Sequence, residues 1–232
     1  KIEQIFSRNL VNAKILADQL DANAIDDINH LTTTDLIIIA VSDAQIEIVA
    51  IQLKALNYQG LVVHTSGSTH LDVLAKQGLN SGVFYPLQTF SFEHQVDWGN
   101  TPLFIEASKQ PHQQDLLTLA EKISHRCYLY DSVQRLSLHL AAVFACNFTN
   151  HCYDIAQQIL QNNEVDVKLL MPLIESTTQK LHSTSAYNNQ TGPARRQDHN
   201  ILNMHQQMLN DQPQWQHIYQ LMSQSILTRF KP

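Results

Sequence analysis

A long apolar segment at residues 138–151, LHLAAVFACNFTNH, carries four polar side chains at helical spacing. These are His139, Asn147, Asn150 and His151. A helix with apolar residues around most of its circumference is predicted to be buried on nearly all sides. Its polar groups then need partners or a ligand, because an unpaired buried polar group is costly. Two interpretations follow: a core helix with satisfied polar groups, or one wall of an active site.

Three short segments of small or polar residues follow three of the predicted strands. The strands are expected at residues 1–8, 36–41 and 61–64. The segments that end them are Ser7-Arg8, Ala40–Asp43 and His64–Ser68. In open parallel sheets, ligands bind outside the carboxyl ends of the strands. These segments are therefore predicted to line a nucleotide site.

Helices are predicted between these strands. One covers residues 11–20 and is capped by Asn9, and the next covers residues 44–56 and is capped by Asp43. The first should bury an apolar stripe formed by Val11, Ile15, Leu16 and Leu20. The continuous apolar run at 36–41 is typical of a strand covered on both faces. The alternation predicts an α/β, Rossmann-like, doubly wound sheet.

The pattern changes from strands to helices near Ser132. Before it, helices are expected at 71–75 and 113–123, and strands at 81–85, 102–106 and 127–130. After it, helices are expected at 135–160, 167–181, 196–209 and 215–227, with a non-helical link at 183–194. Two domains are therefore predicted: a Rossmann-like domain at 1–131 and an all-α C-terminal domain at 132–232.

Composition narrows the function classes. The chain has 232 residues, is 44% hydrophobic and carries a formal net charge of −6, which argues against nonspecific nucleic-acid binding. No segment is apolar for long enough to span a bilayer, so no membrane partner is expected. The three cysteines fit reduced core residues of a cytoplasmic protein. The twelve histidines are scattered without an HExxH motif, so no metal site is predicted.

Several longer phrases resemble one family. They are IFSR, AVSDAQI, VVHTSGS, GVFYPLQTF, HLAAVFACNFTNH, LLMPLIESTTQKL and QTGPARRQD. Together they resemble NADP-dependent oxidoreductases with a Rossmann-like first domain and a helical second domain of unknown function. That family is similar to pyrroline-5-carboxylate reductase and, more distantly, to the 6-phosphogluconate and hydroxyisobutyrate dehydrogenases. The resemblance covers essentially the whole chain.

One departure from the family is large. Its members begin with a strand and a glycine-rich turn of the GxGxxA/G type, whereas this sequence starts at what would be their second strand. We therefore expect the pyrophosphate-binding turn to lie in residues that precede Lys1.

The resemblance and the fold plan together imply a cofactor. An acidic residue after the second strand of a dinucleotide fold binds the ribose of NAD, whereas an arginine accommodates the 2′-phosphate of NADP. Ser7 and Arg8 stand at this place and predict NADP, although a surface arginine is the alternative. In the relatives, the next two loops pass along the ribose and the nicotinamide. Here these loops contain Ala40, Val41, Ser42, Asp43, His64, Thr65, Ser66 and Gly67.

The resemblance also suggests substrate-side residues. The distant dehydrogenases carry a lysine and, four residues later, an asparagine that faces the nicotinamide. Val143 stands where that lysine would lie relative to Asn147, so the lysine's proton-transfer role cannot be carried over. Asn147 could still orient a substrate, His139 could supply a proton, and Asn150 is expected on the same helix face.

Two other segments could meet the substrate. Gln88 is a polar residue within an apolar frame, and either lines the cleft between the domains or caps a buried turn. Gln190, Arg195 and Arg196 belong to a turn ahead of a helix, where paired arginines suit a carboxylate or phosphate. A solvated charge pair is the alternative for these arginines.

The fold plan and the family resemblance together imply an NADP-dependent oxidoreductase. Hydride would pass between NADP(H) and a small molecule with a C=N or C=O group in the interdomain cleft. Relatives of this architecture dimerise through the helical domain, so a homodimer is expected. The alternative is a non-catalytic NADP-binding sensor or interaction protein with the same fold. A scaffold that binds no nucleotide is a third hypothesis.

Overall fold

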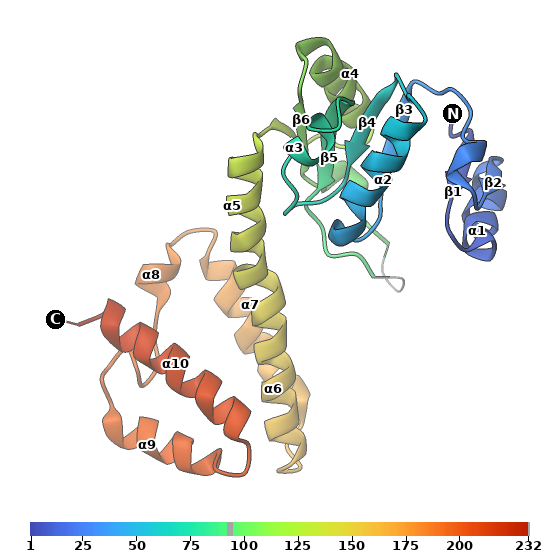
Figure 1. Ribbon diagram of the computed structural model, residues 1–232. Helices are drawn as coiled ribbons and strands as arrows, with labels where there is room; N and C mark the ends of the chain where they lie inside the picture. Colours follow the sequence, from blue (N-terminus) through green and yellow to red (C-terminus); the bar gives the residue numbers. More distant parts are fainter. Residues whose placement is uncertain (92–94, 232) are drawn as a thin grey trace. The chain divides into compact units, whose positions relative to one another are not determined.

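The computed structural model describes residues 1–91 and 95–231 (Figure 1). The chain divides into two compact units, Lys1–Ala145 and Cys146–Pro232, which are described separately below. The first unit holds two sheets and their helices, and the second unit is helical.

The first unit begins with a small β-α-β motif. Strands β1 (Gln4–Phe6) and β2 (Asn23–Ile25) are parallel, and helix α1 (Leu10–Leu20) connects them. As predicted, the Asn9 side chain caps this helix by accepting a hydrogen bond from the amide of Val11 at 2.9 Å. Strand β2 was not predicted, because it is only three residues long and lies between Asp21 and the pair Asp26-Asp27.

The buried face of α1 differs from the prediction. Its buried residues are Ala13 and Ala17. The larger residues of the predicted stripe are exposed, namely Val11, Ile15, Leu16 and Leu20. Helix α1 contacts β1 and β2, and the residues that it buries are alanines, which permit close approach of a helix to a two-stranded sheet.

The main sheet has five strands in the order β3-β4-β5-β6-β7. The first three are parallel, β6 runs antiparallel to β5, and β7 is parallel to β6. The strands are β3 (Leu36–Ile39), β4 (Leu61–His64), β5 (Asn80–Pro86), β6 (Leu103–Ala107) and β7 (Cys127–Leu129). The helices are α2 (Asp43–Ala55), α3 (Asp72–Ala75) and α4 (Gln110–Glu121), with 3-10 turns η1 (Ile28–His30) and η2 (Trp98–Asn100).

Helices cover both faces of this sheet. Val62 packs in one core cluster with residues of α2 and α3, whereas Val63 packs in another cluster with residues of α4. Because successive residues of a strand point to opposite faces, α2 and α4 lie on opposite faces. The predicted α/β, Rossmann-like, doubly wound plan with a helical C-terminal part is confirmed.

Strand β3 departs from the expected burial. Only Ile39 is fully buried, and Ile38 is 50% exposed. The reason is its position, since β3 is an edge strand paired only with β4 within the described sheet.

A long helical segment follows β7. Helix α5 (Ser132–Ala142) starts in a capping box, in which the Asp131 carboxylate accepts from the Gln134 amide at 2.8 Å. It continues as a π-helical segment η3 (Val143–Phe148) and then as α6 (Thr149–Gln161). The predicted helix at 135–160 is thus longer, and it is interrupted by a π-helix that its sequence did not predict.

The remaining helices belong to the second unit. They are η4 (Val167–Leu170), α7 (Met171–Lys180), α8 (Ala186–Asn189), α9 (His199–Met208) and α10 (Pro213–Arg229). The link predicted as non-helical contains the one-turn helix α8, which the Ser185 side chain caps by accepting from the Asn188 amide at 3.3 Å.

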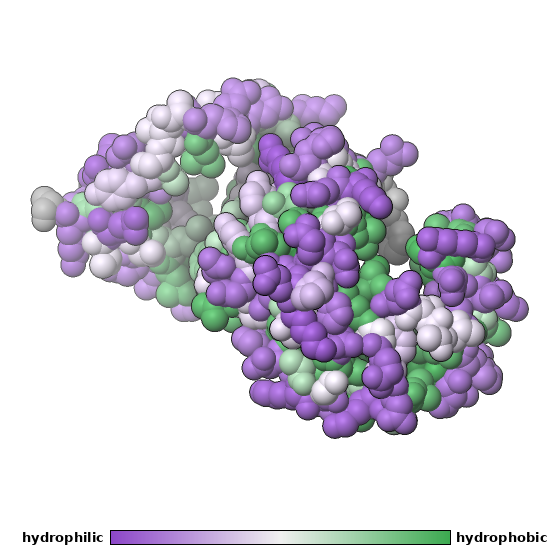
Figure 2. Space-filling view, turned by 90° about the horizontal axis from the view of Figure 1, so that it is seen from above, coloured by the Kyte–Doolittle hydropathy of each residue, from purple (hydrophilic) through white to green (hydrophobic). Residues whose placement is uncertain are grey.

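The prediction that residues 138–151 form a buried helix is wrong for the single chain. Leu140, Phe144 and Phe148 are 58%, 63% and 52% exposed. Figure 2 shows hydrophobic side chains reaching the surface among hydrophilic ones on the face that it displays. Much of the apolar circumference of this helix is therefore exposed in the single chain.

Three further properties concern the described residues. No helix in residues 1–91 or 95–231 is long and apolar enough to cross a membrane. No group of three or more His, Cys, Asp or Glu side chains in these residues is placed to hold a metal ion. Cys127, Cys146 and Cys152 are free thiols, and Cys146 is exposed and does not belong to the core.

Candidate functional site

The loop after β4 is built around the side chain of Ser66. Its hydroxyl accepts hydrogen bonds from the amides of Ser68 and Thr69 at 3.1 and 3.0 Å. The Ser66 amide in turn donates to Nδ1 of His64 at 3.2 Å. This turn holds residues 64–69 in one conformation at the carboxyl end of the sheet, where ligands bind in such folds.

The loops after β3 and β4 are joined directly. The Ser68 hydroxyl donates a hydrogen bond to the carboxylate of Asp43. Asp43 is the first residue of α2, and Ser42 before it is the N-cap without a side-chain cap bond. Ala40, Val41, Ser42 and Asp43 are all exposed. The structure therefore brings these two predicted cofactor loops together and leaves the first accessible.

His64 is buried and uncharged. It is 0% exposed, and burial lowers the pKa of its imidazole from 6.5 to about 4. The Arg135 guanidinium lowers this pKa further, and the Asp43 carboxylate opposes the shift. Because Nδ1 accepts from Ser66, the neutral ring carries its hydrogen on Nε2, which is buried without a hydrogen-bond partner among the described residues.

Gly67 lies against two side chains from other elements. A Cβ atom at this position would lie 2.6 Å from Cζ of Tyr85 and 2.7 Å from Nδ1 of His139. Tyr85 comes from β5 and His139 from α5, and their Oη and Nδ1 atoms are 3.4 Å apart. Three elements that are distant in sequence therefore meet at one point, and any side chain at position 67 would force Tyr85 or His139 to shift.

Burial also affects Tyr85. The residue is 9% exposed, and desolvation raises the pKa of its phenol above 10.0. The Arg135 guanidinium lowers this pKa by a smaller amount. The phenol is thus a stable hydrogen-bond donor at neutral pH.

A buried ion pair holds the first turn of α5, the helix that carries His139. The guanidinium of Arg135, 1% exposed, donates to the Glu106 carboxylate of β6. The Ser132 hydroxyl donates to the same carboxylate at 2.8 Å and accepts from the Leu71 amide at 3.0 Å. Arg135 also donates to the backbone carbonyl of Thr69. The network connects α5, β6 and the loop that contains Gly67.

Three other predicted residues, Ser7, Arg8 and Gln88, make no hydrogen bond to this cluster in the described part of the chain. Ser7 accepts from the Asn9 amide at 3.2 Å, and Arg8 is exposed at the end of β1 without an ion-pair partner among the described residues. Gln88 is exposed, and its Oε1 atom accepts from the Thr89 amide at 2.8 Å. The Gln88 side chain caps an exposed turn and not the buried one of the alternative prediction, and its contact with a substrate remains a prediction.

The remaining predicted residues lie in the second unit. Asn147 belongs to η3 and Asn150 to α6, and both are exposed. Because η3 is π-helical, spacings counted for an α-helix do not apply across it. Gln190 donates to the Thr191 carbonyl at 3.0 Å.

Arg195 and Arg196 are both exposed in the second unit. The Arg195 guanidinium lies over the Phe230 ring, 4.4 Å from its centre. This contact packs Arg195 against the chain's C-terminal end and leaves its ligand-binding role a prediction.

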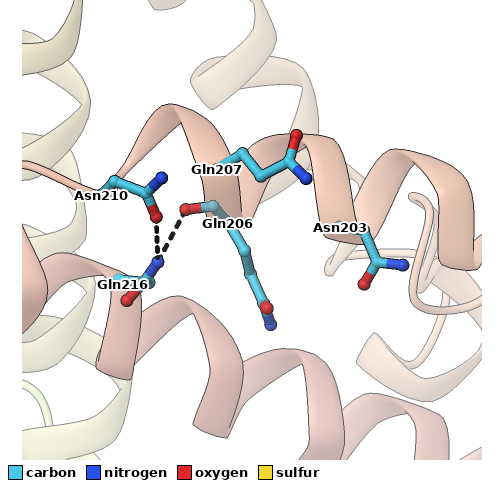
Figure 3. A pocket seen from close by; sticks show the side chains of 5 residues that line it. All are labelled: Asn203, Gln206, Gln207, Asn210 and Gln216. Atoms are coloured by element: carbon cyan, nitrogen blue, oxygen red, sulfur yellow. Dashed lines mark hydrogen bonds between the residues drawn. The ribbon is translucent and has the colours of Figure 1, made fainter.

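The second unit also has a small hollow between α9 and α10 (Figure 3). It has a volume of about 250 Å³ and is lined by the carboxamides of Asn203, Gln206, Gln207, Asn210 and Gln216. The side-chain amide of Gln216 donates hydrogen bonds to the Asn210 side-chain oxygen at 3.0 Å and to the Gln206 backbone carbonyl at 2.8 Å. None of these five groups titrates or acts as a nucleophile, so the hollow does not support a catalytic role.

Four residues of the cluster were missed by the sequence prediction: Tyr85, Glu106, Ser132 and Arg135. Tyr85 ends an apolar strand and looks like a core residue. Arg135 carried a usable signal, because it precedes His139 by four residues and so shares its helix face. Glu106, at the end of a predicted strand, carried none.

The fold and this cluster define a class of protein: a Rossmann-like domain with a polar site at its strand ends, followed by a helical part. A family model described as a domain of unknown function (DUF2520) matches residues 101–226. A crystal structure from Bacteroides fragilis, of a protein assigned as an NADP oxidoreductase, is 38% identical. It superposes with a TM-score of 0.89 and covers 98% of this chain and 89% of that chain. The chain therefore belongs to the family that contains this domain, DUF2520.

More distant structures share the fold. A protein from Thermotoga maritima is 20% identical with a TM-score of 0.70, covering 97% of this chain and 89% of that chain. An imine reductase from Myxococcus stipitatus in complex with NADP+ is 13% identical with a TM-score of 0.64, covering 98% of this chain and 84% of that chain. No curated protein matches the sequence.

Proposed function

We propose that the protein is an NADP-dependent oxidoreductase that transfers hydride between NADP(H) and a small C=N or C=O substrate. The observation that carries the proposal is the meeting of the loops after β3 and β4 with His139 and Tyr85 at Gly67. This point lies at the carboxyl end of a Rossmann-like sheet. The 38% identity to the Bacteroides fragilis protein assigned as an NADP oxidoreductase adds support.

The residues present fit the cofactor. Arg8 offers an exposed guanidinium without an ion-pair partner in the described part of the chain, which suits the 2′-phosphate of NADP. Ala40–Asp43 offers exposed backbone and small side chains, and Gly67 leaves no side chain in the way. When bound, NADPH supplies a hydride at its nicotinamide ring.

The chain's own residues prepare the substrate. His139 presents its imidazole beside Gly67, so a substrate's oxygen or nitrogen can be held by a hydrogen bond to this ring as the substrate's carbon accepts hydride. Asn147 is proposed to orient the substrate. Asn150, Gln88, Gln190, Arg195 and Arg196 remain proposed substrate contacts.

Cofactor choice provides the direct test. We expect the complete protein to bind NADPH more tightly than NADH in a fluorescence titration. Arg8→Ala should weaken NADPH binding about 10- to 100-fold, the effect of losing a charge-assisted hydrogen bond, and leave NADH binding unchanged. Lys54→Ala, which removes an exposed cation from the last turn of α2, is the matched control. Equal affinities for NADPH and NADH would refute the assignment of NADP.

Turnover separates the enzyme from a sensor of the same fold. The enzyme should oxidise NADPH with a member of a panel of imines and ketoacids, and the rate should depend on His139 and Asn147. Tight NADPH binding with no turnover across the panel would instead support a non-catalytic sensor.

We also propose a homodimer through the helical domain, residues 132–232. Val133, Leu136 and Leu140 of α5 are 68%, 50% and 58% exposed, which is a large apolar area for a free surface. Light scattering at micromolar concentration should give the dimer mass, and Leu140→Glu should reduce it to the monomer mass. A monomeric wild type would contradict this.

The free cysteines support a cytoplasmic location.

A further inference from the structure

We propose that Tyr85 is a positioning residue for His139: its phenol donates to Nδ1 of the imidazole, which fixes the ring against Gly67 and leaves Nε2–H as the donor offered to the substrate. The inference rests on the proposed function, in which His139 meets the substrate, and it names how that residue is prepared.

The geometry around the pair is confined on several sides. Tyr85 Oη lies 3.4 Å from His139 Nδ1, and the two rings meet edge to face at 69° with centres 6.4 Å apart. The separation is long for such a bond, as is common for catalytic hydrogen bonds before substrate binds. A Cβ atom at position 67 would lie 2.8 Å from Tyr85 Oη and 2.7 Å from His139 Nδ1, so both atoms lie close to the backbone of Gly67.

Burial keeps the Tyr85 phenol able to donate this hydrogen bond. Tyr85 is 9% exposed, and its phenol stays protonated well beyond neutral pH because desolvation disfavours the phenolate. A neutral imidazole has one donor and one acceptor nitrogen. With the phenol donating, Nδ1 is the acceptor and Nε2 carries the hydrogen.

The backbone under His139 is held as well. Arg135 lies four residues earlier, on the same face of α5, and its buried guanidinium is paired with Glu106. Arg135 also donates to the carbonyl of Thr69, two residues after Gly67. Ser132 adds two hydrogen bonds to the Glu106 carboxylate. The helix therefore cannot slide away from Tyr85 without breaking this network.

The first test reads the tautomer directly and needs no substrate. In long-range ¹H–¹⁵N spectra of ¹⁵N-histidine-labelled full chain, His139, identified by loss of its signals in His139→Asn, should show only the Nε2–H form. Tyr85→Phe removes only the hydroxyl and should introduce the Nδ1–H form. A wild-type Nδ1–H tautomer, or an unchanged spectrum in Tyr85→Phe, would overturn the proposal.

The second test reads catalysis. Tyr85→Phe should lower kcat by about tenfold, the effect of one lost hydrogen bond, with KM for NADPH within about twofold of wild type. In a His139→Asn background the same substitution should cause no further loss, because Tyr85 acts through His139. An additive loss in the double variant would indicate a role independent of His139 and overturn the proposal.

Tyr58→Phe is the matched control. The Tyr58 hydroxyl is also partly buried and donates to the Thr34 carbonyl at 2.8 Å. Thr34 precedes β3 and Tyr58 precedes β4, so this pair lies at the amino ends of these strands and not at the carboxyl ends near Gly67. It should change neither the His139 spectrum nor kcat. If the wild type binds NADPH but turns over no substrate, the proposed function fails, while the spectra still decide whether Tyr85 sets the tautomer.

Discussion

Lowering the pH should destabilise the protein through His64. This residue is 0% exposed, and burial holds the pKa of its imidazole at about 4, against 6.5 for the ordinary side chain. The unfolded chain takes up a proton as the pH falls through 6.5, whereas the folded chain does not until about pH 4. Stability contributed by the neutral ring is thus complete above pH 6.5 and is lost between these two values.

The size of the effect follows from the shift in pKa. Each unit of difference corresponds to about 1.4 kcal/mol, so the full window is worth about 3 kcal/mol. Between pH 7.5 and pH 5, the free energy of unfolding should fall by about 2 kcal/mol because of this residue alone. Urea unfolding of the full chain at a series of pH values, followed by circular dichroism, measures this difference.

His64→Asn separates this residue from other titrating groups. An asparagine carbonyl can accept the hydrogen bond from the Ser66 amide, and it does not titrate. The variant should be less stable at every pH but should lose about 2 kcal/mol less than the wild type between pH 7.5 and 5. Parallel stability curves for the two proteins would refute the conclusion that His64 is buried in its neutral form.

Two further substitutions test the framework of the site. Arg135→Ala leaves the Glu106 carboxylate without its cation and should lower the free energy of unfolding by about 3–5 kcal/mol, measured with urea. Asp21→Asn is the control, because it breaks the exposed pair of Lys1 and Asp21, 3.9 Å apart, and should change the free energy of unfolding by less than about 0.5 kcal/mol. A loss under about 1 kcal/mol for Arg135→Ala would show that water screens the ion pair. Gly67→Ala introduces a methyl group against Tyr85 and His139 and should lower stability by about 1–3 kcal/mol. An unchanged melting temperature would mean that these rings move aside freely.

The sequence predicted the parts of the fold that depend on local pattern. The apolar run Leu61–His64 has the bounds of β4, and Asn9 caps α1 as expected. The prediction failed where neighbouring elements decide burial. Apolar periodicity assigns large residues to the core, but α1 buries Ala13 and Ala17 instead. Ile38 is half exposed because its strand is at an edge of the described sheet.

The site divides in the same way. The loops at the carboxyl ends of β3 and β4 were predictable, because the fold rule places ligands there and the residues are small or polar. Tyr85 and Glu106 were not, because each gains its role from strand pairing and from a helix that returns later in the chain. Their side chains alone look like a core aromatic and a surface acid.

The π-helical segment Val143–Phe148 affects how motifs can be compared between relatives. A π turn carries one residue more than an α turn, and each residue of an α-helix advances about 100° around the axis. Residues that follow the π-helix therefore lie on a different helix face from the one that a continuous α-helix would give them. A residue four positions from another is on the same face only if both lie on the same side of the segment. A relative whose helix is unbroken here would align only with a one-residue gap. The residue of a relative that aligns with Val143 then depends on where this gap is placed. The same holds for the position in this chain that corresponds to the lysine of the distant dehydrogenases.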